Sequence, residues 1–90
     1  MEYEFDPAKA KSNFRKHGIA FSDVERFDWD SAIVIRDDRE DYGEDRFRAL
    51  GFIDETLCAM VFTEREELVR VISLRRASRQ ERVSYDRQAE

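Results

Sequence analysis

The 90-residue sequence has few of the residues that crosslink or punctuate a small protein. It contains one cysteine, one proline, one histidine and three glycines. A single thiol excludes an internal disulfide, and Cys58 lies in an apolar run that favours an inert, buried side chain. We therefore expect a reducing compartment, the cytoplasm, and a domain held together by one modest hydrophobic core.

Long hydrophobic runs are also absent. The longest, residues 57–62, has six residues, whereas a membrane-spanning helix needs roughly 18. The first residues, Met-Glu-Tyr-Glu-Phe-Asp, show neither the basic start nor the apolar stretch of a signal peptide. We expect a single domain over residues 1–90 that has no membrane partner.

Several kinds of reactive site are missing as well. One histidine and one buried cysteine do not supply the clustered ligands of a metal site. The acidic segment 37–45 lacks the ligand spacing of a calcium loop, and we interpret it as a solvated loop, with a contact to a protein partner as the alternative. There is no Gly-rich phosphate loop and no nucleophile elbow. We expect no cofactor and no metal, which leaves chemistry on an anion by His, Lys and Arg side chains.

Charge is unevenly distributed along the chain. The formal net charge is −5, yet residues 22–46 carry a net −6 and residues 65–90 a net +2. An acidic total argues against loose binding to nucleic acid, because such binding scales with the number of phosphates neutralised. An anion site in this chain is therefore expected to be focal.

The residue patterns predict an α+β fold. Asp6 and Pro7 are typical of a helix start, and Gly18 would end that helix after about His17. A capping box beginning at Ser22 predicts a short second helix over roughly 23–28. The predicted strands cover residues 2–5, 32–35, 47–53, 57–63 and 68–74, and a last helix covers 79–88. Short gaps imply hairpins, so the expected order is β-α-α-β-β-β-β-α with an antiparallel sheet packed by helices.

The joint between the last strand and the last helix concentrates positive charge. Arg75 and Arg76 precede a helix N-terminus, whose free N–H groups add donors for an anion. A guanidinium suits phosphate because its planar fork donates two hydrogen bonds at once. Ser73 is expected to share a strand face with Arg75 and with the apolar Val69 and Val71. The alternative is a solvated surface of intrahelical ion pairs.

Other polar residues allow more than one interpretation. His17 is an acid–base candidate near neutral pH and Lys16 a phosphate contact, but both also favour the negative end of a helix dipole. Glu64 is either a weak candidate for a base or an ordinary turn carboxylate. Tyr85 either packs against the domain or stacks on a nucleobase.

Three blocks of sequence carry a family pattern. They are F-D-P-A-K-x-x-x-N-x-x-K-H-G-I-x-F at residues 5–21, E-D-R-F at 44–47 with a following Gly51, and R-V-I-S-x-R-R-A-S-R-x-E-R-x-x-Y at 70–85. In order and spacing they resemble the BrnT family, toxins of type II toxin–antitoxin systems. Phe5 stands where tryptophan is common, and Arg65-Glu66-Glu67 replaces a turn that usually has glycine. Both departures concern packing and turn geometry.

The resemblance implies a RelE-like fold and RNA cleavage without a metal, which would inhibit translation and growth. It also implies neutralisation by a BrnA-like antitoxin with a ribbon-helix-helix domain. The toxin would contact operator DNA only through that antitoxin. We hypothesise attack of the ribose 2′-hydroxyl on the adjacent phosphate. The candidate catalytic residues are His17, Lys16, Arg75, Arg76 and Glu64; the candidate RNA contacts are Arg70, Ser73, Tyr85 and Arg79.

This hypothesis requires His17 to come close to Arg75 in the folded protein. The alternative is a non-catalytic module whose arginines dock an antitoxin, so that the chain acts only as a binding partner and co-repressor. Cleavage of RNA by the purified protein separates the two.

Overall fold

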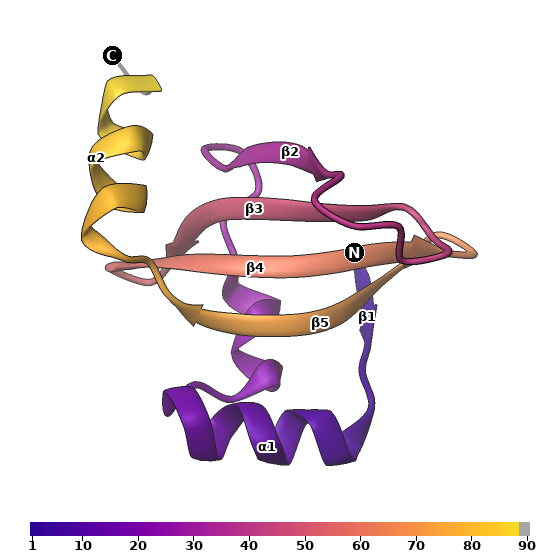
Figure 1. The fold of residues 1–90 in the computed structure, drawn as a ribbon. Helices are drawn as coiled ribbons and strands as arrows, with labels where there is room; N and C mark the ends of the chain where they lie inside the picture. The colour runs from indigo at the N-terminus through magenta and orange to yellow at the C-terminus, as the bar shows by residue number, and fades with distance from the viewer. Residues whose placement is uncertain (89–90) are drawn as a thin grey trace.

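The computed structural model describes residues 1–88 as one five-stranded sheet with helices at its side and its end (Figure 1). Helices α1 (Pro7–His17) and η1 (Phe21–Arg26) pack on one face, and α2 (Arg79–Gln88) stands at the strand ends. No helix in this range is long and apolar enough to cross a membrane. The elements are β1 (Glu2–Glu4), α1 (Pro7–His17), η1 (Phe21–Arg26), β2 (Ile33–Asp37), β3 (Arg46–Ile53), β4 (Thr56–Arg65), β5 (Leu68–Arg76) and α2 (Arg79–Gln88).

The α+β class and the order of elements agree with the sequence prediction, but two details were wrong. The sheet order is β1-β5-β4-β3-β2, and β1 runs parallel to β5, so the sheet is mixed and not antiparallel. The second helix, η1, is a 3₁₀ helix whose N-cap is Ala20. Ser22 lies inside η1, where its side chain caps nothing, so the predicted capping box does not form.

Helix α1 has the ends that its sequence predicts. The Asp6 carboxylate accepts a hydrogen bond from the Ala8 N–H at 2.8 Å, and Pro7 occupies the first turn. Gly18 ends the helix at φ 73°, a left-handed conformation that glycine adopts without strain. Its N–H donates to the Phe14 carbonyl at 2.7 Å. These local contacts set where the chain turns back toward the sheet.

One face of the sheet is closed by α1 and η1. Its core includes Met60 and Leu74, which pair across β4 and β5 and are both 0% exposed. Cys58 lies in the same core, and burial raises the pKa of its thiol. The core is completed by apolar residues from the segment between α1 and β2 and from the strands, among them Ile19, Phe21, Val24, Phe27, Ala49, Ile53, Phe62 and Val71.

A β-bulge determines which side chains of β5 face this core. Val61 pairs with Ser73 while Phe62 pairs with Val71, so one extra residue of β5 is inserted between these pairs. The insertion keeps both Val71 and Leu74 in the core. Ser73 therefore shares its face with Arg75 but not with Val71, which corrects the face assigned from simple alternation.

Asn13 ties α1 to the edge of β5. Its side chain is buried, and Nδ2 donates to the Leu74 carbonyl at 2.7 Å while Oδ1 accepts from the Leu74 N–H at 3.2 Å. Both backbone groups lie on an edge that β1 does not reach, because β1 pairs only with residues 68–70. The asparagine side chain thus takes the place of a neighbouring strand.

Candidate active site

A groove of about 320 Å³ lies over the open face of the sheet, opposite the core. Arg39, Arg48 and Arg75 line it, and α2 contributes Glu81 and two uncharged polar residues. The floor is mostly apolar and comes from β2, β3 and β4; the residues whose side chains face it are Ile33, Ile35, Leu50, Ala59 and Val61. The groove therefore combines an apolar floor with three guanidinium groups.

Arg75 is held by a carboxylate of α2. Its Nη1 and Nη2 donate to the two oxygens of Glu81 at 2.7 and 3.0 Å. Glu81 also accepts from the Ser78 N–H at 2.8 Å, and Ser78 Oγ accepts from the Glu81 N–H at 3.1 Å. This confirms the capping box predicted for the last helix. Hydrogen bonding from Arg75 is the main reason that the pKa of Glu81 is lowered to about 2.

Arg39 is held by a buried carboxylate at the end of β2. The Asp37 side chain is 1% exposed and accepts from Arg39 Nε at 2.7 Å and Nη2 at 2.8 Å. These bonds, with a smaller attraction from Arg48, lower the pKa of Asp37 to about 2. The segment 37–45 was predicted to be a solvated loop. Its first residue is instead part of the groove's support.

Arg48 is half-buried in the groove. Its Nε is buried and has no hydrogen-bond acceptor within the residues that the structure describes. A buried donor without an acceptor costs free energy, and the cost is larger for a charged group. An anion in the groove would bring negative charge to this guanidinium.

Arg76 lies on the opposite face from Arg75. Its partner across the sheet is the core residue Cys58, whereas Arg75 is opposite Ala59. Arg76 Nη1 donates to the His17 carbonyl at 3.2 Å and so caps the C-terminus of α1. Lys16 is exposed and His17 half-buried at that helix end. The structure therefore brings His17 to Arg76 and does not bring it to Arg75.

Two predicted site residues lie at the far end of the sheet. Arg70 pairs with Glu4 at 3.4 Å. Glu64 is exposed near the hairpin between β4 and β5. Arg70 lies five positions before Arg75, which is about 17 Å along an extended strand. Neither residue lines the groove.

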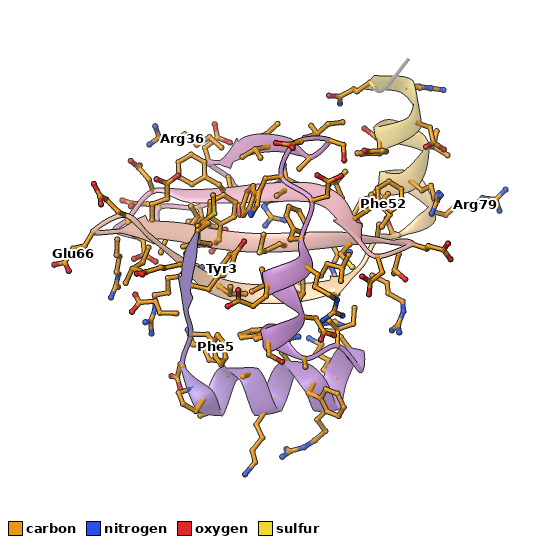
Figure 2. All side chains as sticks on the ribbon, turned by 180° about the vertical axis from the view of Figure 1, so that it is seen from behind. Tyr3, Phe5, Arg36, Phe52, Glu66 and Arg79 are labelled. Carbon is orange, nitrogen blue, oxygen red and sulfur yellow. The ribbon has the colours of Figure 1, made fainter. Side chains whose placement is uncertain are left out.

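The remaining predicted RNA contacts differ in exposure. Tyr85 is 7% exposed; its ring packs edge-on against Phe52 at 5.6 Å and its hydroxyl donates to the Ser31 carbonyl at 2.9 Å. Because the ring is buried against the domain, it is not available to stack on a base. Ser73 is half-buried on the groove face. Arg79 is exposed and extends away from the sheet (Figure 2).

Sequence reasoning missed Arg39 and Arg48. Arg48 did carry a signal, because it alternates with the buried Ala49 in β3 and so faces the same side as Leu50. Arg39 carried none, since its position depends on the burial of Asp37. Among residues 1–88, no three His, Cys, Asp or Glu side chains gather closely enough to hold a metal ion.

Comparison with known proteins then identifies the family. Residues 5–81 match the model of a family described as "Ribonuclease toxin, BrnT, of type II toxin-antitoxin system". The chain belongs to the BrnT family. As a member it is a ribonuclease toxin, whose substrate is RNA and whose partner is a protein antitoxin. No curated protein matches this chain. The family match ends at Glu81, so the groove arginines lie within it and most of α2 lies outside it.

Proposed function

We propose that this BrnT-family toxin cleaves RNA in the groove, without a metal ion. The observation that carries the proposal is the set of three guanidinium groups above an apolar floor, two of them held by carboxylates. Such a site suits a nucleotide, because the apolar floor can accept a base while the arginines bind its phosphate. The other cluster, at the end of α1, has Arg76 already engaged with a helix carbonyl.

In the proposed reaction the ribose 2′-oxygen bonds to the adjacent phosphorus and the bond from phosphorus to the 5′-oxygen breaks, which gives a 2′,3′-cyclic phosphate and a 5′-hydroxyl. Water takes the proton of the 2′-hydroxyl and supplies one to the 5′-oxygen. The phosphorane transition state carries more negative charge than the substrate. Arg75 is placed to stabilise it, because Glu81 occupies two of its five N–H donors and fixes the orientation of the rest. One preorganised donor of this kind typically contributes about 10²–10³ to the rate.

Proton transfer in this mechanism runs through solvent. Glu81 is the only carboxylate among the groove-lining residues that the structure describes. With a pKa of about 2 it is ionised and a poor base near neutral pH. The groove therefore acts mainly through charge stabilisation and through alignment of the 2′-hydroxyl with the phosphorus.

The test is cleavage of a labelled RNA by the purified toxin in the presence of EDTA. Arg75→Ala and Arg48→Ala should each lower the rate by about 10²–10³. Arg26→Ala is a matched control, since Arg26 pairs with Asp54 at 3.2 Å outside the groove. Circular dichroism should show that the variants remain folded. Full activity of both groove variants, or loss of activity in EDTA, would overturn the proposal.

His17→Ala separates this site from the one first predicted. In the groove mechanism His17 touches no substrate, so the variant should retain a rate within about fivefold of the unmodified toxin, well below the loss expected for a general acid–base group. A loss as large as that of Arg75→Ala would place proton transfer at the end of α1 instead.

For the physiological setting we propose a cytoplasmic toxin that inhibits translation and growth. Its partner would be a BrnA-like antitoxin with a ribbon-helix-helix domain, which alone contacts operator DNA. The non-catalytic alternative predicts no cleavage by the free protein. Toxin that cuts RNA alone and stops when the antitoxin is added excludes that alternative.

A further inference from the structure

Strand β2 is the outermost strand of the sheet, and one of its edges has no partner among the residues that the structure describes. Its other edge pairs with β3, with Val34 opposite Ala49 and Ile35 opposite Arg48. Along the unpaired edge, none of the residues 1–88 supplies a neighbouring strand. Such an edge presents a row of free N–H and C=O groups, which another chain can extend.

The opposite edge of the sheet, formed by β5 and β1, is covered. There the free edge of β5 is satisfied by Asn13, whose side chain binds both backbone groups of Leu74. β1 pairs with the first residues of β5. The protein therefore covers its edge at β5 and leaves its edge at β2 open.

The side chains of β2 also lack most features that protect an edge. Val34 is 45% and Ile35 is 48% exposed, so apolar surface is accessible on both sides of the strand. The pairing of β2 with β3 is regular and contains no bulge. The one basic side chain, Arg36, donates to Asp45 at 2.6 Å and is partly neutralised. Edges that resist association commonly carry free charges, prolines or bulges.

Charge decides which kind of chain would fit this edge. Residues 28–45 contain eight acidic residues and two arginines, a net charge of −6. After β2, Asp38, Glu40 and Asp41 form no ion pair with any residue that the structure describes. Before it, Asp28 and Asp30 are exposed. Acidic groups therefore flank the edge at both ends.

A second copy of this chain is a poor match for such an edge. Antiparallel pairing of two β2 strands about a two-fold axis would place the acidic flank of each copy beside that of the other. Repulsion between like charges opposes this arrangement. A basic partner would gain from the same charges.

We propose that β2 binds an extended, basic segment of the antitoxin by strand addition. Backbone hydrogen bonds along β2 would provide affinity, and apolar side chains of the segment would cover Val34 and Ile35. Lysine or arginine residues at its ends would meet the acidic flanks. That an antitoxin exists follows from the family; the inference concerns where it binds and does not depend on the groove being the catalytic site.

The first test uses Val34→Lys and measures binding of the antitoxin encoded with this toxin by calorimetry. Val34 does not line the groove, so RNA cleavage should be unchanged while affinity falls about tenfold or more. Val83→Lys is the matched control, because Val83 is equally exposed, at 46%, but lies on α2. Its affinity should stay unchanged. Equal affinities for the two variants would overturn the proposal.

The second test is amide hydrogen exchange in the intact toxin and its antitoxin complex. The outward N–H groups among residues 33–37 should exchange quickly in the free toxin and become protected in the complex. A complex that forms without protection at 33–37 would overturn the proposal. Protection in concentrated toxin alone, together with a dimer in sedimentation, would assign the edge to a second copy and also overturn it. Neither the calorimetry nor the hydrogen exchange requires ribonuclease activity, so the outcomes of these two measurements are independent of the groove proposal.

Discussion

The two faces of the sheet are built on different principles, although the same strands form both. On the face covered by α1 and η1, aromatic rings interlock: Phe27 packs on Trp29 at 4.8 Å, and Trp29 on Phe62 at 5.3 Å, both edge-on. On the open face, half-exposed aliphatic side chains lie beneath arginines that carboxylates hold in place. The covered face carries the hydrophobic core that stabilises the fold. The open face can therefore hold charged groups near the surface.

The largest expected difference concerns two neighbouring residues of β4. Met60 is 0% exposed in the core, whereas Val61 points to the groove and is half-buried. Met60→Ala should lower the free energy of unfolding by about 2–5 kcal/mol, because it leaves a cavity. Val61→Ala should cost only about 1 kcal/mol, since its side chain is small and already partly exposed. Urea denaturation measures both, and equal costs would contradict the comparison.

Gly51 tests how closely the covered face is packed. A Cβ at this position would lie 2.5 Å from Cζ of Phe27 and 3.0 Å from Cβ of Ala32. Gly51→Ala should therefore destabilise the protein by about 1–3 kcal/mol through overpacking. The double variant with Phe27→Leu should be less destabilised than the sum of the two single variants, because the shorter side chain makes room. If the destabilisations of the two single variants simply add in thermal denaturation, the Phe27 ring moves aside without needing the shorter side chain.

The smallest expected effect concerns the ion pair on the open face. The pKa of Glu81 is about 2 in the folded protein and about 4.5 ordinarily, so its carboxylate stabilises the fold above pH 4.5 and this contribution disappears as pH falls toward 2. The pair is partly exposed, so the contribution is at most about 1 kcal/mol.

Glu81→Gln retains the capping box because glutamine also serves at that position. The variant should therefore be less stable than the unmodified protein at pH 6 and equally stable near pH 2. Acid titrations followed by circular dichroism compare the two proteins. A stability difference that does not change with pH would contradict the shifted pKa.

The ends of α1, the start of α2 and the hairpins could be predicted from sequence because their causes are local. Asp6 and Gly18 bound α1, and Ser78 with Glu81 begins α2, as their spacing indicates. The hairpin between β4 and β5 forms even though Glu66 and Glu67 both have positive φ, at 49° and 70°. Its strands hold the turn despite residues that disfavour this conformation.

The pairing of β1 and the bulge in β5 could not be predicted in this way. Whether β1 runs parallel or antiparallel to β5 depends on where α1 docks, and that is decided by distant groups such as Asn13 and Leu74. The bulge in β5, opposite Val61 and Phe62 of β4, keeps both Val71 and Leu74 buried in the core. Periodicity within a single strand carries no information about an inserted residue.

The candidate site shows the same limit. Arg75 was found from sequence because it lies beside a predicted helix start. Its neighbour Arg76 was grouped with it, yet alternation along β5 sends the two side chains to opposite faces. Arg39 and Arg48 were missed because their approach to Arg75 depends on the sheet register and on the burial of Asp37.

The contacts that close the sheet also impose an order on its assembly in a growing chain. Glu2 pairs with Leu68, and Asn13 with Leu74, so the first strand and helix lack their main partner until β5 has been made. Contacts between such distant residues form slowly, because a long loop must close first. The groove needs Arg75 from that same strand and Glu81 from α2. A ribosome translating this message therefore makes most of the toxin before any nascent copy can assemble the surface that we propose attacks RNA.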